Sequence, residues 1–175
     1  MRSAAVLFVF LLGALVAAGQ APMDAKLLEQ LKRLFPSATA FSPKEGDPPH
    51  FTAYLGDPKS GTQAVAGVAF WTTELEPLER GYGGPIKILV GIDMKGILAG
   101  IIVVEHHEPY GHFSVEPPEF AAQFRNKNLR DRFVVGDDID EVSRASISVG
   151  SATRAVRNSA RRIARQLLTP PGAGR

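Results

Sequence analysis

Hydrophobic and polar residues alternate along this chain in short patterns that predict a helix first and strands after it. Residues 24–35 repeat leucine at intervals of three or four positions, which predicts an amphipathic helix capped by Asp24 and ended by Pro36. Residues 50–55 and 64–73 favour strands, and the turn-rich stretch between them indicates a hairpin. The chain therefore enters its fold through one helix and one strand pair.

The strongest strand pattern comes in the middle of the chain. Residues 86–92 and 97–104 are almost continuously aliphatic, which predicts strands buried on both faces. The four residues between them predict a tight hairpin in which Gly96 takes a positive φ. A short helix is expected over 116–125, with two prolines in its first turn.

The clearest helical pattern is the last one. Residues 151–168 carry a continuous stripe of small apolar side chains with arginines on the other faces. A hydroxyl-rich stretch, residues 140–150, leads into this helix from the acidic run 136–140. Helix, strands, short helix, loop and long helix in that order predict an α+β fold, with an antiparallel sheet packed by a long C-terminal helix and shorter helices.

Composition narrows the class of protein. The 175 residues suffice for one domain, and a net charge of +2 predicts no nucleic-acid partner. The absence of cysteine excludes disulfides, thiol catalysis and cysteine-ligated clusters within this chain. An apolar run from Ala4 to Ala18, after a positive start and before small residues, predicts a signal peptide over residues 1–21, with an uncleaved membrane anchor as the alternative.

Two groups of residues suggest chemistry by themselves. A hydroxyl-rich loop before a helix N-terminus suits a phosphate group, although such a loop is also an ordinary helix cap. Arg154, in the predicted first turn, is placed to neutralise a bound phosphate. The histidine-rich segment 105–112 does not predict a metal site, because neighbouring side chains on a strand, such as His106 and His107, point to opposite faces.

Within the hydroxyl-rich loop, Asp140-x-x-Ser143-x-Ala145-Ser146 resembles the D-x-x-[ST]-G-A-[TS] signature of the FMN-binding domain family. The order of other segments is similar to the NosR-like branch of that family, which is related to one subunit of the Rnf complex and to one subunit of the sodium-pumping NADH:quinone oxidoreductase. These segments are Gly67-Val-Ala-Phe70, Gly81-Tyr82-x-Gly84, Leu89-Val-Gly-Ile-Asp93 and Glu105-His-His-Glu-Pro109.

The resemblance implies that FMN is the cofactor and that a flavin transferase attaches it through its phosphate to Ser146. Thr153 is the second choice of acceptor, because Gly150-Ser-Ala-Thr153 is similar to the signature with two letters exchanged. The chain departs from the signature by Arg144 in place of glycine and by serine in place of the commoner threonine. The other residues that the resemblance places around FMN are Asp140, Ser143, Arg144, Ala145, Tyr82, Gly83, Gly84, His107, Glu108 and Arg154.

The expected organisation has four parts: the signal peptide 1–21, an N-terminal helix and first strand over 22–64, an FMN-binding domain over 65–168 and a disordered tail over 169–175. The resemblance implies a periplasmic electron-transfer domain whose partner is a membrane electron-transfer component or a periplasmic redox protein. Three alternatives stay open: a sensory or partner-binding module that holds flavin or another ligand without a covalent bond and without redox turnover, a small flavin reductase, and a structural domain without cofactor.

Overall fold

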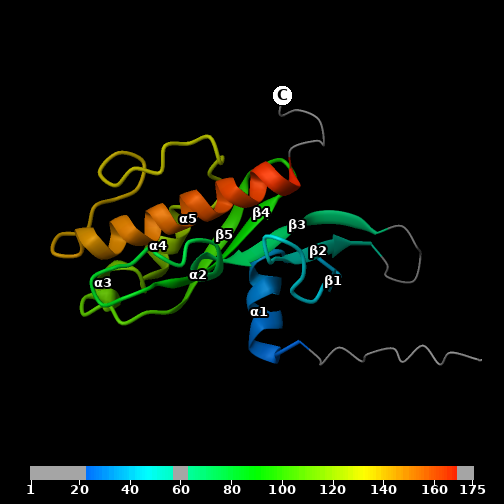
Figure 1. Ribbon diagram of the computed structural model, residues 1–175, viewed down its shortest axis with the longest axis horizontal. Helices are drawn as coiled ribbons and strands as arrows, with labels where there is room; N and C mark the ends of the chain where they lie inside the picture. The colour runs from blue at the N-terminus through cyan, green and yellow to red at the C-terminus, as the bar shows by residue number, and fades with distance from the viewer. Residues whose placement is uncertain (1–22, 57–62, 169–175) are drawn as a thin grey trace, which may run out of the picture.

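The computed structural model describes residues 23–56 and 63–168, so the signal peptide predicted over 1–21 and the tail predicted over 169–175 lie outside the described residues. The described residues form a five-stranded antiparallel sheet with helices packed on it, which confirms the α+β fold class (Figure 1). The strands follow one another in the sheet in chain order: β1 (Ala40–Phe41), β2 (Phe51–Leu55), β3 (Ala64–Trp71), β4 (Lys87–Asp93) and β5 (Leu98–Glu105). The helices are α1 (Ala25–Leu34), α2 (Thr72–Leu75), α3 (Gly111–Ser114), α4 (Pro118–Ala122) and α5 (Ser146–Leu167).

Two hydrophobic cores lie on opposite faces of this sheet because successive side chains of a strand alternate between its faces. Ile88 and Val90 of β4 belong to the larger core, under α5 and α4. Leu89, between them, belongs to the smaller core, with Leu31 of α1. β4 is therefore buried on both faces, as its aliphatic sequence predicts.

The structure confirms the predictions that rest on local patterns. Asp24 caps α1 by accepting a hydrogen bond from the backbone N–H of Leu27 at 3.1 Å. The two hairpins, β2 with β3 and β4 with β5, pair antiparallel. Gly96 has a φ of 79° in the turn before β5. The sequence predicts a boundary between residues 64 and 65, where the FMN-binding domain is expected to begin. In the sheet, Ala64 and Val65 both lie in β3 and pair with Leu55 and Tyr54 of β2.

Several boundaries differ from the sequence prediction. α5 begins at Ser146, five positions before the expected start at residue 151, so much of the hydroxyl-rich stretch is helical. Glycine and hydroxyl residues weaken the local helix signal here, and tertiary packing of Val149 and Ala152 overrides it. α4 is shorter than the helix expected over 116–125. β3 ends at Trp71 rather than at residue 73, because α2 begins at Thr72. The Thr72 hydroxyl donates to the Ile86 backbone oxygen at 3.2 Å and accepts the Ile88 N–H at 3.1 Å.

The short elements β1, α2 and α3 were not predicted, since two to four residues carry too little periodicity to be recognised. Within residues 23–56 and 63–168, no helix is both long enough and apolar enough to cross a bilayer. The long helix α5 packs on the larger core, and its first turn meets the loops that follow β5 and precede β4.

Candidate functional site

The residues that resemble the FMN signature form the turn before α5 and its first residue. Arg144 has a φ of 68°, in the left-handed region, and Ala145 is the N-cap residue of the helix. Left-handed backbone is disfavoured for residues with a Cβ and is readily adopted by glycine. The family signature has glycine at this position, so the turn conformation explains that preference, and Arg144 adopts it at a cost in conformational energy.

Ser146, the first residue of α5, is exposed, and its hydroxyl lies 3.4 Å from a carboxylate oxygen of Glu141. N–H groups in the first turn of a helix lack intrahelical acceptors and form the positive end of the helix dipole. Ser146 therefore presents an accessible hydroxyl at a place that favours a phosphate group.

Ser146 lines two clefts. The first, which we call the tyrosine cleft, encloses about 360 Å³ and is mainly apolar. It is lined by Tyr82, Pro109, Tyr110, Arg144, Ala145, Ser146, Ile147 and Ser148. The exposed rings of Tyr82 and Tyr110 and the exposed side chain of Ile147 give it surfaces suited to packing on a flat aromatic ring. A cleft of this size and apolar character fits the isoalloxazine ring of a flavin, next to a hydroxyl that suits its phosphate.

The second, which we call the arginine cleft, encloses about 400 Å³ and also has Ser146 in its lining. It is lined by Phe133, Val134, Val135, Glu141, Ser146, Gly150, Thr153, Arg154 and Arg157. Larger cavities occur elsewhere: one of about 690 Å³ lies at the last turns of α5, and one of about 480 Å³ lies along β5. Neither contains a residue of the FMN signature, so cavity size alone does not identify the site.

Thr153, the second-choice acceptor, is very different from Ser146. Its side chain is 1% exposed, and its hydroxyl oxygen is buried without a hydrogen-bond partner in the described part of the chain. A modifying enzyme cannot reach a hydroxyl in this position without opening the packing of α5. Burial therefore favours Ser146 over Thr153 as the acceptor.

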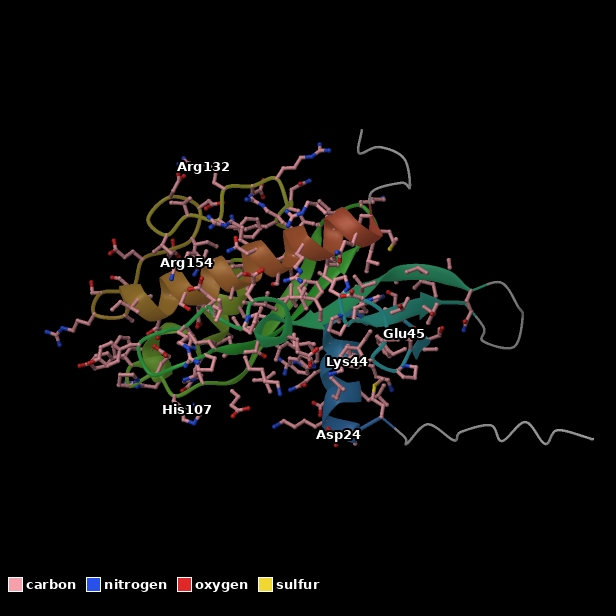
Figure 2. All side chains as sticks on the ribbon, in the orientation of Figure 1. Asp24, Lys44, Glu45, His107, Arg132 and Arg154 are labelled. Atoms are coloured by element: carbon pink, nitrogen blue, oxygen red, sulfur yellow. The ribbon has the colours of Figure 1, made fainter. Side chains whose placement is uncertain are left out.

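Arg154 lines the arginine cleft but is already paired. Its guanidinium group donates to the Glu79 carboxylate, with an Nη2–Oε1 distance of 2.7 Å. Figure 2 shows Arg154 on α5. The positive charge that the sequence assigned to a phosphate is thus largely balanced by a residue 75 positions away.

The wall of the arginine cleft is held by Asp138 in the acidic run. The Asp138 carboxylate accepts hydrogen bonds from the backbone N–H groups of Phe133 at 3.0 Å and Val134 at 2.6 Å, and from Lys127 Nζ at 3.2 Å. Burial alone would raise the pKa of Asp138, but these donors and the Lys127 charge outweigh it and hold the pKa below its usual value. Asp140 and Ser143 are exposed, and the Asp140 backbone N–H donates to Gln123 Oε1 at 2.6 Å.

Glu108 is the most enclosed carboxylate near the site, with 7% of its side chain exposed. It accepts hydrogen bonds from the backbone N–H groups of Tyr82 at 3.0 Å and Gly83 at 2.9 Å, and from the Ser148 hydroxyl of α5. It lines neither cleft. Glu108 therefore joins three segments that are far apart in the sequence.

The histidines next to Glu108 have different surroundings. His106 Nδ1 accepts the backbone N–H of Glu108 at 3.1 Å, and its Nε2 lies 3.1 Å from Glu116 Oε1. His107 is exposed, at the end of the molecule where α5 begins (Figure 2). His106 is thus part of the framework, whereas His107 is accessible to solvent.

The structure brings most of the expected residues to one end of the molecule. Tyr82, Arg144, Ala145 and Ser146 line the tyrosine cleft, while Gly83 and Gly84 lie in the turn that carries Tyr82. Sequence reasoning missed Tyr110, Glu141, Ile147 and Ser148. Tyr110 follows the Glu105–Pro109 segment directly and Ile147 is an apolar residue among hydroxyls, so both carried a weak signal.

Comparison with known proteins agrees with this geometry. The profile of the FMN-binding domain family matches residues 81–161. The chain is similar to regulatory protein NosR of Stutzerimonas stutzeri, with 27% identity over 156 residues, which cover 83% of this chain and 21% of NosR. It is also similar to the G component of the ion-translocating oxidoreductase complex of Yersinia pestis, with 31% identity over 112 residues, which cover 58% of this chain and 51% of that component.

A shorter match to the G component of the Haemophilus influenzae complex reaches 45% identity over 47 residues, which cover 27% of this chain and 21% of that component. The chain spans about a fifth of NosR and about half of the Yersinia pestis component. The matched residues 81–161 include the turn of Tyr82, Glu108, the signature turn and most of α5. Residues 81–161 of this protein therefore match the FMN-binding domain family, and this match supports FMN as the cofactor.

Proposed function

We propose that the protein is a periplasmic electron-transfer module that carries FMN bound covalently to Ser146. The observation that carries this proposal is the position of Ser146, an exposed hydroxyl at the N-terminus of α5 and on the shared edge of the two clefts. Bound FMN supplies the redox chemistry. The protein's own groups hold the cofactor and limit the access of water to it.

The residues divide the task of holding FMN. The N–H groups of the first turn of α5 face the phosphate, because they have no acceptor within the helix. Tyr82, Tyr110 and Ile147 offer apolar surface to the ring in the tyrosine cleft. Arg144 lines the same cleft and is the cationic residue of the signature segment 140–146.

Attachment requires a flavin transferase and FAD as the donor of the FMN group. In this step the Ser146 oxygen forms a bond to the phosphorus of the FMN half, the pyrophosphate P–O bond breaks, AMP leaves, and the hydroxyl proton passes to a base. No electrons are exchanged. The present chain is the substrate of that reaction, and its contribution is an accessible hydroxyl in a fixed turn.

The partners follow from the relatives. NosR is named a regulatory protein, and the G component is named for an ion-translocating oxidoreductase complex. We propose that this chain likewise exchanges electrons with a membrane component or a periplasmic redox protein. The predicted signal peptide supports an extracytoplasmic location.

The test is intact mass after export from cells that co-express a flavin transferase. We expect the parent protein to gain the mass of an FMN phosphoester that survives denaturation. Ser146→Ala is expected to abolish the gain, whereas Thr153→Ala is expected to keep it, because the Thr153 hydroxyl is buried.

Two results would count against this assignment. Loss of the added mass in Thr153→Ala alone would move the acceptor to Thr153. No added mass in the parent, alongside a control substrate that the transferase modifies, would remove covalent attachment.

A second candidate function is a sensory or partner-binding module that holds FMN without a covalent bond. Arg144 favours it, since an arginine on the edge of the tyrosine cleft stands where the family signature has glycine. Such a protein would be yellow when purified and would lose its colour completely on denaturation. The same mass measurement separates the two functions.

A further inference from the structure

We infer that Glu108 is a positioning residue. It sets the distance between the loop that carries Tyr82, which forms one wall of the tyrosine cleft, and the first turn of α5, which carries Ser146. The inference rests on the proposed function, since it concerns how the cleft that would receive the flavin ring is held open. It assigns Glu108 a different task from contact with the cofactor, because Glu108 lines neither cleft.

The contacts of Glu108 connect the two sides of the cleft. Its Oε2 accepts the N–H of Tyr82 at 3.0 Å, and its Oε1 accepts the N–H of Gly83 at 2.9 Å. Oε2 also accepts the hydroxyl of Ser148, two residues after Ser146 in α5. The wall and the helix are therefore joined through one buried carboxylate.

Only a close approach of the backbone allows this arrangement. A Cβ on Gly81 would overlap Oε1 of Glu108, and a Cβ on Gly83 would overlap the backbone oxygen of His107. Any side chain at either position would therefore push the loop away from the carboxylate. The glycines thus let the loop lie directly on the segment that carries Glu108.

Tyr82 depends on this anchor more than a packed residue would. Its side chain is 72% exposed, so burial does little to fix it. Its backbone is held on one side by the Glu108 carboxylate and on the other by the turn bond from the Gly81 N–H to the Gly84 oxygen, at 2.7 Å. Loss of the carboxylate frees the residue that forms one wall of the cleft.

The identity of the acceptor atoms matters as well as their position. All three groups that meet the side chain of Glu108 donate hydrogen bonds, and a carboxylate offers two accepting oxygens. Glutamine has nearly the same shape but replaces one oxygen with a donor, which then faces an N–H group or a hydroxyl. Glu108→Gln is therefore a change of chemistry with little change of volume.

The first experiment measures amide hydrogen exchange in the full chain without flavin. Glu108→Gln is expected to speed the exchange of the Tyr82 and Gly83 amides on the order of tenfold, because part-buried hydrogen bonds to a carboxylate acceptor are lost. Glu116→Gln is the matched control: it is the same substitution in the same region, but the side chain of Glu116 pairs with the His106 ring instead. The control is expected to leave both amides unchanged.

The second experiment examines the protein after flavin attachment. We expect Glu108→Gln to carry FMN by mass but to show lower flavin fluorescence anisotropy and stronger quenching by iodide than the parent. Ser148→Ala, which removes the link from Glu108 to α5 and one hydroxyl from the lining of the tyrosine cleft, is expected to shift both signals in the same direction by a smaller amount. A role in stability alone would lower the unfolding midpoint without changing the flavin signals of the folded protein.

The outcomes separate this inference from the proposed function. Unchanged exchange at both amides in folded Glu108→Gln, or unchanged flavin signals in both variants, overturns the positioning role while covalent FMN stands. Absence of FMN from the parent overturns the proposed function, and the exchange comparison still decides whether Glu108 anchors the loop. If Glu108→Gln does not fold, Ser148→Ala decides by the flavin signals.

Discussion

The first and the last turns of α5 use their polar groups in opposite ways. In the first two turns the Ser146 side chain is exposed between two clefts, and the buried Thr153 hydroxyl has no partner in the described part of the chain. Toward the other end, Arg161 donates to the backbone oxygens of Leu129 at 3.0 Å and Asp131 at 2.7 Å. Arg162 donates to the backbone oxygen of Leu75 at 2.8 Å.

The difference shows that one helix carries two tasks. Its later turns secure loops and the core, so Arg161 and Arg162 are not part of a free basic surface. Its first turns leave a hydroxyl and helix N–H groups available, which is what a ligand site needs. Substitution of Arg161 or Arg162 should therefore change stability without changing flavin attachment, and substitution of Ser146 should do the reverse.

The largest effect on stability is expected from Ile163→Ala. Ile163 is fully buried in the larger core, and removing its side chain leaves a cavity, which costs about 2–5 kcal/mol of unfolding free energy. Urea denaturation measures the loss. Flavin attachment to the folded fraction should match the parent, and Ser146→Ala should change the unfolding free energy by less than about 0.5 kcal/mol. A defect in attachment proportionate to the loss of stability would contradict the division of the helix.

Two arginines of α5 give a direct comparison of its ends. Arg161→Ala removes two hydrogen bonds to carbonyl oxygens and should cost about 1–3 kcal/mol. Arg154→Ala removes a partly exposed ion pair with Glu79 and should cost about 0–1 kcal/mol. Urea midpoints of the two variants test the order. An equal or larger cost for Arg154 would show that the rim of the arginine cleft also supports the fold.

Asp138 makes stability depend on pH in a defined direction. Its pKa is lowered in the folded protein, so the unfolded chain binds its proton more readily. The contribution of Asp138 is therefore complete above about pH 3.9, the usual pKa of an aspartate, and is lost as the pH falls through the lower folded value. Asp138→Asn should cost about 1–2 kcal/mol near neutral pH.

Urea midpoints measured from pH 6 to pH 3 check this expectation, since the gap between parent and Asp138→Asn should narrow at the acidic end. Asp137→Asn is the control, because Asp137 pairs with the exposed side chain of Arg132 and its carboxylate bonds no backbone N–H in the described residues. A gap that stays constant with pH would mean that the charge of Asp138 is not what holds the loop.

The parts of the fold that follow from short-range pattern could be predicted from the sequence. The α1 helix, both hairpins and the positive φ of Gly96 each depend on residues within a few positions of one another. The start of α5 could not be predicted in this way. It depends on the left-handed backbone of Arg144 and on the bond between Ser148 and Glu108, 40 residues apart.

The candidate site shows the same limit. The resemblance to the family identified the segments, and the structure brings Tyr82 and Ser146 to one cleft. The pairing of Arg154 with Glu79 and the burial of Thr153 depend on contacts across the fold, which no local pattern encodes. The sequence therefore identifies candidate hydroxyls for FMN attachment, and the exposure of each hydroxyl in the folded protein distinguishes one candidate from another.

The smallest expected effect concerns the signature turn itself. Arg144→Gly relieves a left-handed conformation that costs about 1–2 kcal/mol for a residue with a Cβ, but it adds about 0.5–1 kcal/mol of unfolded-state entropy. The net expectation is a gain of roughly 0.5–1 kcal/mol in unfolding free energy, measured by urea denaturation. Flavin attachment should be at least as fast as in the parent, since the variant restores the family signature.

Ser143→Gly provides the opposite control in the same turn. Ser143 is exposed and is not among the residues with positive φ in the described chain, so glycine there brings only the entropic cost. We expect Ser143→Gly to lose stability where Arg144→Gly gains it. If Arg144→Gly is instead less stable than the parent, the arginine side chain must make a compensating contact in solution. If it is more stable but accepts flavin more slowly, Arg144 assists attachment, and the departure from the signature serves the site rather than weakening it.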